Sequence, residues 1–239
     1  MRATMLSSNS RELLAKVSSA TLTTVLFKRG LRNVFIQGVF LLNREAPRMV
    51  GEAYTLRYIP AREDIDQLGA FEGRGHPQRE AIEACPPGHV LVMDARRDAS
   101  AATGGDILMT RLMVRGAAGI VTDGGLRDTP TIEKLAFPVY CGARSAPLNL
   151  VRHHAVEAEV PIGCGGVAVY PGDVMVGDAE GVVVVPAKLT DEVAREAAAQ
   201  TEFEDWVEAK VKEGRSIFGL YPPNADTKAE YEAWKKNRR

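Results

Sequence analysis

The feature that most constrains the fold is a strand–helix–strand succession between residues 89 and 123. The apolar run of residues 89–95 predicts a buried strand, and residues 119–123 predict another. Between them, residues 106–115 have the apolar spacing of a helix, which Gly116 ends. Strands joined in this way form a β-α-β unit, so the sequence predicts an α/β fold.

The segments on either side of this unit predict further helices and strands. Residues 10–30 predict a helix with Ser10 as its N-cap and Gly30 at its end, or two short helices, because threonines weaken the middle. A helix is also expected at residues 78–84, inside the longest loop. Apolar runs rich in β-branched residues predict strands in three more ranges: 34–42, 50–59 and 163–186.

The composition changes after Pro186. A long amphipathic helix is predicted there, with Thr190 as its cap and Asp191 and Glu192 in its first turn. We therefore expect a domain over residues 1–189 and a helical extension over residues 190–239. An arm of this length on a finished core indicates contacts between subunits.

Composition and charge exclude several classes of protein. The 239 residues are 45% hydrophobic and 26% charged, as in globular proteins. The formal charge of -1 offers no electrostatic footprint for nucleic acid or for an anionic membrane, so neither is an expected partner. Three cysteines without a CxxC spacing argue against a disulfide framework or a zinc knuckle. No apolar window reaches the length of a membrane span, and we expect a soluble, cytoplasmic protein.

The stretch GGLRDTP, residues 124–130, places Arg127 beside Asp128 where a strand should end. Its two glycines predict a turn cleared of side chains, with a mouth open to substrate. An Arg-Asp pair after a strand is often only a surface ion pair, worth at most about 1 kcal/mol. The Arg-Asp pair indicates a binding site only if other site residues lie beside it.

A helix start is expected at the same edge of the sheet. Asp106 follows Gly105 and precedes the apolar helical pattern, so it can cap the helix while the amides of Ile107 and Leu108 point outward. Free amides at a helix start attract anions. Open α/β sheets bind their ligands at the carboxyl ends of the strands, so helix start and Arg-Asp pair should share one mouth.

Such a mouth suits a keto acid bound to a divalent cation. Arg127 and the helix amides would hold the carboxylate, and Asp128 would give Mg²⁺ or Mn²⁺ a hard oxygen ligand. Mg²⁺ keeps several of its waters, so one protein carboxylate and a chelating substrate are enough. These residues alone name no reaction.

Residues 104–140, GGDILMTRLMVRGAAGIVTDGGLRDTPTIEKLAFPVY, resemble the core motif of the RraA-like family. That family includes class II 4-hydroxy-4-methyl-2-oxoglutarate / 4-carboxy-4-hydroxy-2-oxoadipate aldolases and regulators of a ribonuclease. The likeness extends to SSATLTTVLFKRG, VGEAYTLRY and PIGCGGVAVYPGDVMVGDAEGVVVVP, and so covers roughly residues 15–190. It implies a swivelling β/β/α domain of three layers, with residues 190–239 as an arm in a trimer or a pair of trimers.

The resemblance also implies a role for each residue of the mouth. In the family's aldolases, the Arg-Asp pair follows the helix-opening aspartate by 21 and 22 residues, as Arg127 and Asp128 follow Asp106 here. Asp128 would then ligate Mg²⁺ or Mn²⁺, Arg127 would bind the pyruvyl group and stabilise its enolate, and Asp106 would order metal-bound water. The helix start, from Gly105 through Ile107 to Leu108, would receive the substrate carboxylate.

The activity that the resemblance implies is a metal-dependent aldol cleavage. A 4-hydroxy-2-oxo acid would give pyruvate and a second carbonyl product, and oxaloacetate decarboxylation, which forms the same enolate, would be a side activity. No lysine is placed to form a Schiff base, so the metal would serve as the electron sink. The general base and the physiological acid stay open.

The chain also departs from the family's pattern. Thr24 stands where members often carry an aspartate, and the loop of residues 60–89 has its own character. Its polar residues Arg74, His76 and Arg79 could meet a distal carboxylate or sugar-acid hydroxyls, or could simply be solvated.

Other polar residues also allow both a functional and a structural interpretation. Glu202 or Glu204 on the long helix could approach a neighbouring subunit's metal site, or could belong to a solvated helix face. His153 and His154 are expected in a helix and, being adjacent, should face different ways, which argues against a paired metal site.

Three other functions compete with the aldolase. A non-catalytic regulator that binds a ribonuclease shares the fold, but the regulators lack a long C-terminal arm. A methyltransferase is disfavoured because no strand ends in a GxGxG turn for a nucleoside cofactor. A phosphohistidine-carrying domain is disfavoured because none of the four histidines has a suitable setting.

Overall fold

A mixed sheet with parallel strands at its middle organises the fold. The computed structural model describes residues 6–237, so the ends of the expected domain and extension, residues 1–5 and 238–239, lie outside it. The strands are β1 (Phe40–Leu41), β2 (Met49–Pro60), β3 (Val90–Asp94), β4 (Gly119–Leu126), β5 (Val139–Arg144), β6 (His153–Ala158), β7 (Ile162–Cys164), β8 (Val167–Val169), β9 (Val174–Gly177) and β10 (Val182–Val185). The helices are α1 (Ser8–Leu14), α2 (Ser19–Lys28), α3 (Pro77–Ala84), α4 (Asp106–Val114), α5 (Thr129–Ile132), α6 (Thr190–Lys212) and α7 (Ala225–Lys236).

The strand order confirms the predicted α/β fold. Neighbouring strands follow the order β1-β5-β4-β3-β2-β9-β10, and β6 also pairs with β2. Strands β2 to β5 are parallel, as the β3-α4-β4 crossover requires, while β1, β6, β9 and β10 join antiparallel. The twelve-residue strand β2 pairs with β9 near its start and with β3 and β6 further on. It therefore links two parts of the curled sheet.

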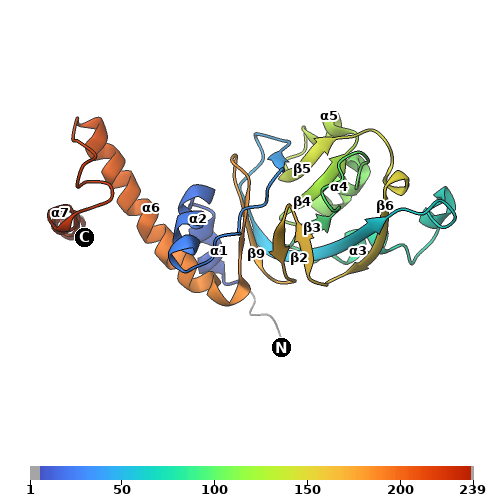
Figure 1. Cartoon of the computed structure of the whole chain (residues 1–239), viewed down its shortest axis with the longest axis horizontal. Coiled ribbons are helices and arrows are strands. Elements are labelled where there is room, and N and C mark those ends of the chain that lie inside the picture. Colours follow the sequence, from blue (N-terminus) through green and yellow to red (C-terminus); the bar gives the residue numbers. More distant parts are fainter. Residues whose placement is uncertain (1–5, 238–239) are drawn as a thin grey trace.

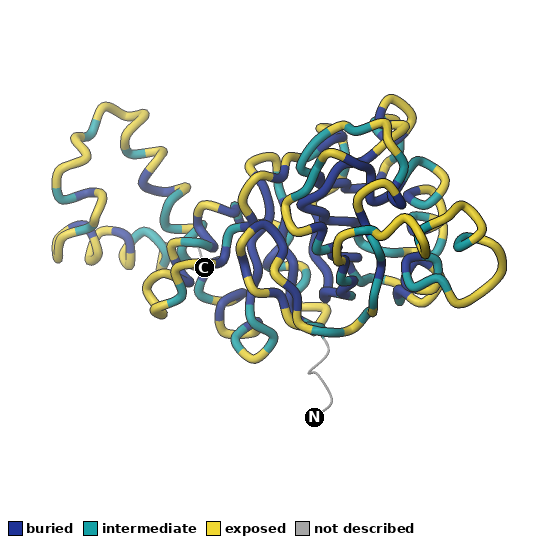
Figure 2. Tube along the Cα trace, turned by 45° about the vertical axis from the view of Figure 1, so that its right-hand side comes forward, coloured by how far each residue is buried: buried dark blue, intermediate teal, exposed yellow. Residues whose placement is uncertain are grey.

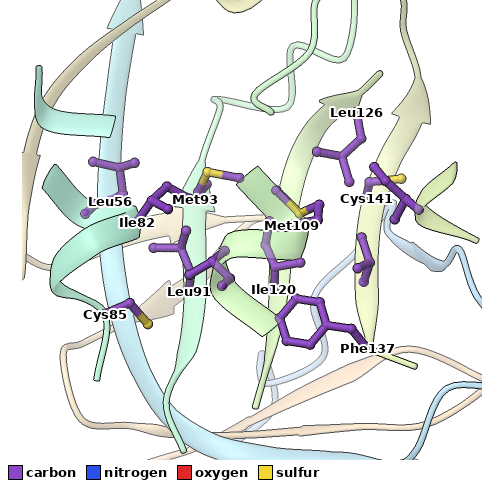
Figure 3. Close-up of a cluster of buried hydrophobic side chains, with 14 of the residues drawn as sticks. Leu56, Ile82, Cys85, Leu91, Met93, Met109, Ile120, Leu126, Phe137 and Cys141 are labelled. Atoms are coloured by element: carbon purple, nitrogen blue, oxygen red, sulfur yellow. The ribbon is translucent and has the colours of Figure 1, made fainter. Parts of the chain in front are cut away.

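Buried apolar side chains fill the spaces between successive layers. Figure 3 shows the first cluster, in which side chains of α3 and α4, such as Ile82 and Met109, pack on those of the strands, such as Leu91 and Ile120. A second cluster lies between the parallel strands and the segments β7 to β10. A third joins β9 and β10 to α1, α2 and the first turns of α6. This layering agrees with the expected three-layer architecture.

The C-terminal helices extend away from the sheet. Figure 1 shows α6 running outward past α1 and α2, with α7 at its far end, and Figure 2 shows that most of this arm is exposed or half-buried. A separate cluster of Trp206, Val207, Leu220 and Tyr231 holds α7 against α6. The arm therefore has a small apolar centre of its own.

Helix starts differ from the predicted caps by a few residues. The N-terminal region forms two short helices, capped by the hydroxyls of Ser7 and Ser18. Ser10 is not a cap: it is buried in α1, and its hydroxyl donates to Asp191 of α6 at 2.5 Å. Thr190 is the first residue of α6 rather than its cap, and its hydroxyl donates to the carbonyl oxygen of Pro186.

The predicted helix around His153 and His154 is wrong, because these residues begin strand β6. Pairing with β2 overrides the local preference, since β6 completes one edge of the sheet. The alternation of a strand sends the two side chains to opposite faces, as expected for adjacent residues. His153 is fully buried, whereas His154 is half-buried and pairs with Asp66 at 2.7 Å.

Candidate functional site

Strand β4 extends to Leu126, beyond the predicted end at residue 123. Gly124 and Gly125 are therefore buried strand residues, and the prediction that they clear an open turn is wrong. A Cβ on Gly124 would lie 2.6 Å from the Ala95 Cβ, and one on Gly125 would lie 2.8 Å from the Ala101 carbonyl oxygen. The glycines thus let the β3–α4 loop pack directly on β4.

This close packing brings the helix start to the strand end. Ala102 forms a parallel bridge with Gly125, and the Thr103 amide donates to the Gly125 carbonyl oxygen at 2.8 Å. From α3, the buried Gln78 side chain donates to the Thr103 carbonyl oxygen at 2.5 Å. The loop therefore delivers the first turn of α4 beside the residues that follow β4.

At that junction, Gly105 lies against the Arg-Asp pair. A Cβ on Gly105 would lie 2.6 Å from Oδ2 of Asp128 and 3.1 Å from Cγ of Arg127. Arg127 Nε and Asp128 Oδ2 are 3.2 Å apart, and the two side chains are 45% and 41% exposed, so both can still reach a ligand. Asp128 has a left-handed backbone with φ of 56°, which directs its side chain back toward the helix start.

Asp106 is the first residue of α4, and Gly105 occupies the N-cap position, so the predicted cap is displaced by one residue. The Asp106 carboxylate accepts from the Ile107 amide at 2.8 Å, while the Leu108 amide donates to the Gly105 carbonyl oxygen at 3.1 Å. A substrate carboxylate would have to replace these acceptors. Reception of a carboxylate by these amides therefore stays a prediction.

The predicted residues border one cavity of about 260 Å³. Gly105, Asp106, Ile107, Leu108, Arg127 and Asp128 all line it. The cavity is thus large enough for a small organic acid, and the helix start and strand end do share a mouth.

Another part of the cavity lining comes from the loop of residues 60–89 and from α3. Arg79 lines the cavity there, with its guanidinium carbon 4.7 Å from the centre of the Phe71 ring. Its Nε is buried without a hydrogen-bond partner. Of the three polar residues singled out in this loop, Arg79 is the one that borders the cavity. The His76 ring lies 4.7 Å from the Phe71 ring, tilted by 56°, and Arg74 is exposed.

Sequence reasoning missed Asn149, which also lines the cavity. It opens a short turn, Asn149–Val151, and is 5% exposed. Neither polar atom of its side-chain amide has a hydrogen-bond partner. No pattern in the sequence marks this position, because the loop around residue 149 meets the site only through the tertiary fold.

The remaining polar candidates lie elsewhere. Glu204 accepts hydrogen bonds from Thr21 at 2.7 Å and from Gln200 at 2.9 Å, so it already serves to join α6 to α2. Glu202 is exposed on α6. Within residues 6–237, neither glutamate borders the cavity.

The oxygen donors at the cavity fit a divalent cation that keeps several water ligands, such as Mg²⁺. Asp106 and Asp128 offer hard carboxylate oxygens, and Asp128 is accessible. Among the described residues, no group of three or more His, Cys, Asp or Glu side chains could hold a metal. A cation here would take one or two carboxylates from the chain and the rest of its ligands from water and substrate, which is how Mg²⁺ commonly binds.

Comparison with known proteins identifies the family. Residues 15–184 match the family model described as RraA-like, Aldolase/RraA. The chain belongs to the RraA-like family. This confirms the resemblance of the core motif, which lies wholly inside the matched range.

Several RraA-like relatives resemble the chain. A protein of Halalkalibacterium halodurans named "Putative 4-hydroxy-4-methyl-2-oxoglutarate aldolase" is 37% identical over 119 residues, 49% of this chain and 56% of that protein. The chain thus spans about half the length of several curated relatives that it matches.

Solved structures share the RraA-like fold. The structure of RraAS2 of Streptomyces coelicolor, titled a member of the RNase ES inhibitor RraA protein family, is 30% identical, with a TM-score of 0.75 over 86% of this chain and 98% of that chain. A protein of Pseudomonas syringae pv. tomato at 24% identity has a TM-score of 0.81 over 92% of this chain and 96% of its own. Relatives therefore carry both an aldolase name and an inhibitor title.

Proposed function

We propose that this RraA-like protein is a divalent-metal-dependent pyruvate aldolase, which cleaves a 4-hydroxy-2-oxo acid to pyruvate and a second carbonyl product. The observation that carries the proposal is the single cavity bordered by Asp106, Arg127 and Asp128. The relative named for 4-hydroxy-4-methyl-2-oxoglutarate cleavage supports it. Decarboxylation of oxaloacetate would accompany it, because both reactions release the same enolate.

The cation would be Mg²⁺ or Mn²⁺, held by Asp128. When bound, it would supply positive charge that stabilises the enolate oxygen. Arg127 would add a fixed guanidinium charge at the same place, since its side chain is both accessible and held by Asp128. Asp106 would turn from the Ile107 amide to direct a proton acceptor toward the 4-hydroxyl, leaving that amide free for the substrate carboxylate.

Arg79 would bind the distal end of the substrate. It lines the same cavity as Arg127 and Asp128, and its Nε has no hydrogen-bond partner among the described residues. A guanidinium that lies over an aromatic ring is well placed to pair with a carboxylate, because its N–H groups point outward in the plane of the guanidinium. The substrate would then be a dicarboxylic acid.

The test is pyruvate release measured with a coupled assay. Protein loaded with Mg²⁺ or Mn²⁺ should release pyruvate from 4-hydroxy-4-methyl-2-oxoglutarate and from oxaloacetate, and a chelator should abolish both. Asp128→Ala should lower kcat by at least about 10²-fold, the scale for losing one electrostatic contact to a developing charge. Metal-loaded protein that turns over neither acid would reject the aldolase.

That negative outcome would favour the alternative function, a regulator that binds a ribonuclease. The similarity to the inhibitor-family structure of Streptomyces coelicolor supports this second candidate. It predicts that the protein slows RNA cleavage by a ribonuclease of that kind and that Asp128→Ala does not affect the inhibition.

Self-association completes the proposal. Exposed apolar side chains on α4 and on the arm, Ile107 at 77% and Phe218 at 91%, are candidates for burial in a trimer or a pair of trimers. Residues 6–237 contain no helix long and apolar enough to cross a membrane. A cytoplasmic location stays part of the proposal.

A further inference from the structure

The Asn149 amide is a buried polar group that the chain leaves unused. Its side chain is 5% exposed, and both Nδ2 and Oδ1 lack a hydrogen-bond partner. Because both atoms are unpaired, exchanging the amide oxygen and nitrogen would not change this conclusion. A buried amide without hydrogen-bond partners destabilises the folded state, so its presence at a cavity wall indicates that a ligand pairs with it.

Chemistry limits what that ligand can be. The amide offers one acceptor and two N–H donors. A carboxylate could satisfy only the donors, and an ammonium only the acceptor. A hydroxyl both donates and accepts, so it can satisfy the two sides of the amide together.

The position of Asn149 relates this chemistry to the substrate. Asn149 and its neighbour Leu148 line the same cavity as Arg79, Arg127 and Asp128. A 4-hydroxy-2-oxo diacid carries its hydroxyl between the keto acid end and the distal carboxylate. The amide is covered in the structure and would turn toward the cavity about its broad terminal torsion.

We propose that Asn149 recognises the 4-hydroxyl of the substrate and so makes the site selective for aldol cleavage over decarboxylation. This inference rests on the proposed aldolase function. Oδ1 accepts the hydroxyl hydrogen and Nδ2 donates to the hydroxyl oxygen. In the cleavage step, the hydroxyl proton passes from this hydrogen bond to the proton acceptor that Asp106 directs, and the O–H electron pair forms the C4=O double bond. The C3–C4 electron pair passes into the enolate, and Nδ2 keeps its hydrogen bond to the new carbonyl oxygen. Oxaloacetate has no such hydroxyl and gains nothing from this contact.

The experiment compares two substrates in one variant. Asn149→Leu removes both polar atoms at similar size and strands no partner, since the amide has none in the chain. We expect kcat/KM for 4-hydroxy-4-methyl-2-oxoglutarate to fall by about tenfold or more, the size of one good hydrogen bond in the transition state. The kcat/KM for oxaloacetate decarboxylation should stay within about twofold.

A matched control uses the adjacent residue of the same wall. Leu148→Ala trims the cavity without removing a polar group, so both activities should change by one common factor. A common factor for Asn149→Leu as well, or no change in either activity, would overturn the role of Asn149. Wild-type protein inactive on both acids would instead reject the aldolase function and this inference with it. Circular dichroism of each variant verifies that the fold is retained.

Discussion

At the scale of single residues, the site depends on a missing side chain as much as on charged ones. Gly105 has an extended backbone, with φ of -136°, that any residue can adopt. Glycine is needed there because a Cβ at position 105 would lie only 2.6 Å from Asp128 Oδ2, which is too close for the two atoms. This close approach holds the Asp128 carboxylate and Arg127 against the helix start, so the proposed activity should depend on the absence of a side chain at position 105.

Gly105→Ala tests this link. The added methyl group should push Asp128 and Arg127 aside, and a displacement of about 1 Å can cost about 10²-fold in kcat. Stability should change little, because the two displaced side chains are partly exposed. Gly163→Ala is the control, since a Cβ at Gly163 meets nothing within 4 Å. Equal pyruvate-release rates for the two variants would contradict the proposed role of Gly105.

His153 couples pH to the loop that carries the site. Burial lowers the pKa of His153, and the nearby Arg96 lowers it further, against a raising effect of the Ala101 carbonyl. The neutral ring fits its contacts, since Nδ1 lies 3.3 Å from an Arg96 donor and Nε2 lies 3.3 Å from the Ala101 oxygen. Arg96 belongs to the β3–α4 loop, and protonation of Nδ1 would set a second donor against its guanidinium, so protonation would disturb this loop.

The sign of the pH effect follows from this lowered pKa. Below the ordinary value of 6.5, the unfolded chain binds a proton at position 153 that the folded chain refuses, so stability falls as the pH falls. Urea unfolding at pH 7.5 and 5.5 should show this loss in the wild type and a smaller loss in His153→Gln, whose amide can keep both contacts. A variant that loses as much stability as the wild type would show that other groups dominate.

At the scale of elements, local pattern predicted the β-α-β unit well and its end poorly. Apolar runs bounded β3 and the start of β4 because these strands bury almost every side chain, and α4 was bounded by the helical spacing of its apolar residues. The sequence predicts a turn at Gly124 and Gly125, since glycine usually interrupts strands. They continue β4 because a loop more than twenty residues earlier in the chain packs on them, and a local window cannot contain that contact.

The candidate site divides in the same way. Arg127, Asp128 and Asp106 could be predicted, because strand ends and helix starts gather at one edge of a parallel sheet. Asn149 could not be, because it sits in an irregular turn whose neighbours along the chain reveal nothing about the cavity. Strand β6 was missed for a related reason, since its pairing with the end of β2 is a long-range contact.

At the scale of the whole molecule, two bodies of unequal size share one long helix. The first turns of α6 bury Val193, Ala194 and Ala197 in the third core cluster, whereas its far turns join α7 in the aromatic cluster around Trp206 and Tyr231. The aromatic cluster is small, so little burial of apolar surface opposes the entropy gained when α7 detaches. Local opening should therefore precede global unfolding.

Both tryptophans of the chain report on this arm, because Trp206 lies inside the aromatic cluster and Trp234 packs against it. In a urea titration, tryptophan fluorescence should change at a lower midpoint than circular dichroism at 222 nm, which reports on all helices and strands. If subunits bury the arm, as the proposed self-association requires, a tenfold higher protein concentration should raise the fluorescence midpoint toward the circular dichroism midpoint. Coincident midpoints at every concentration would mean that the arm and the sheet unfold together. A fluorescence transition that is separate but does not depend on concentration would place the subunit contacts elsewhere than on the arm.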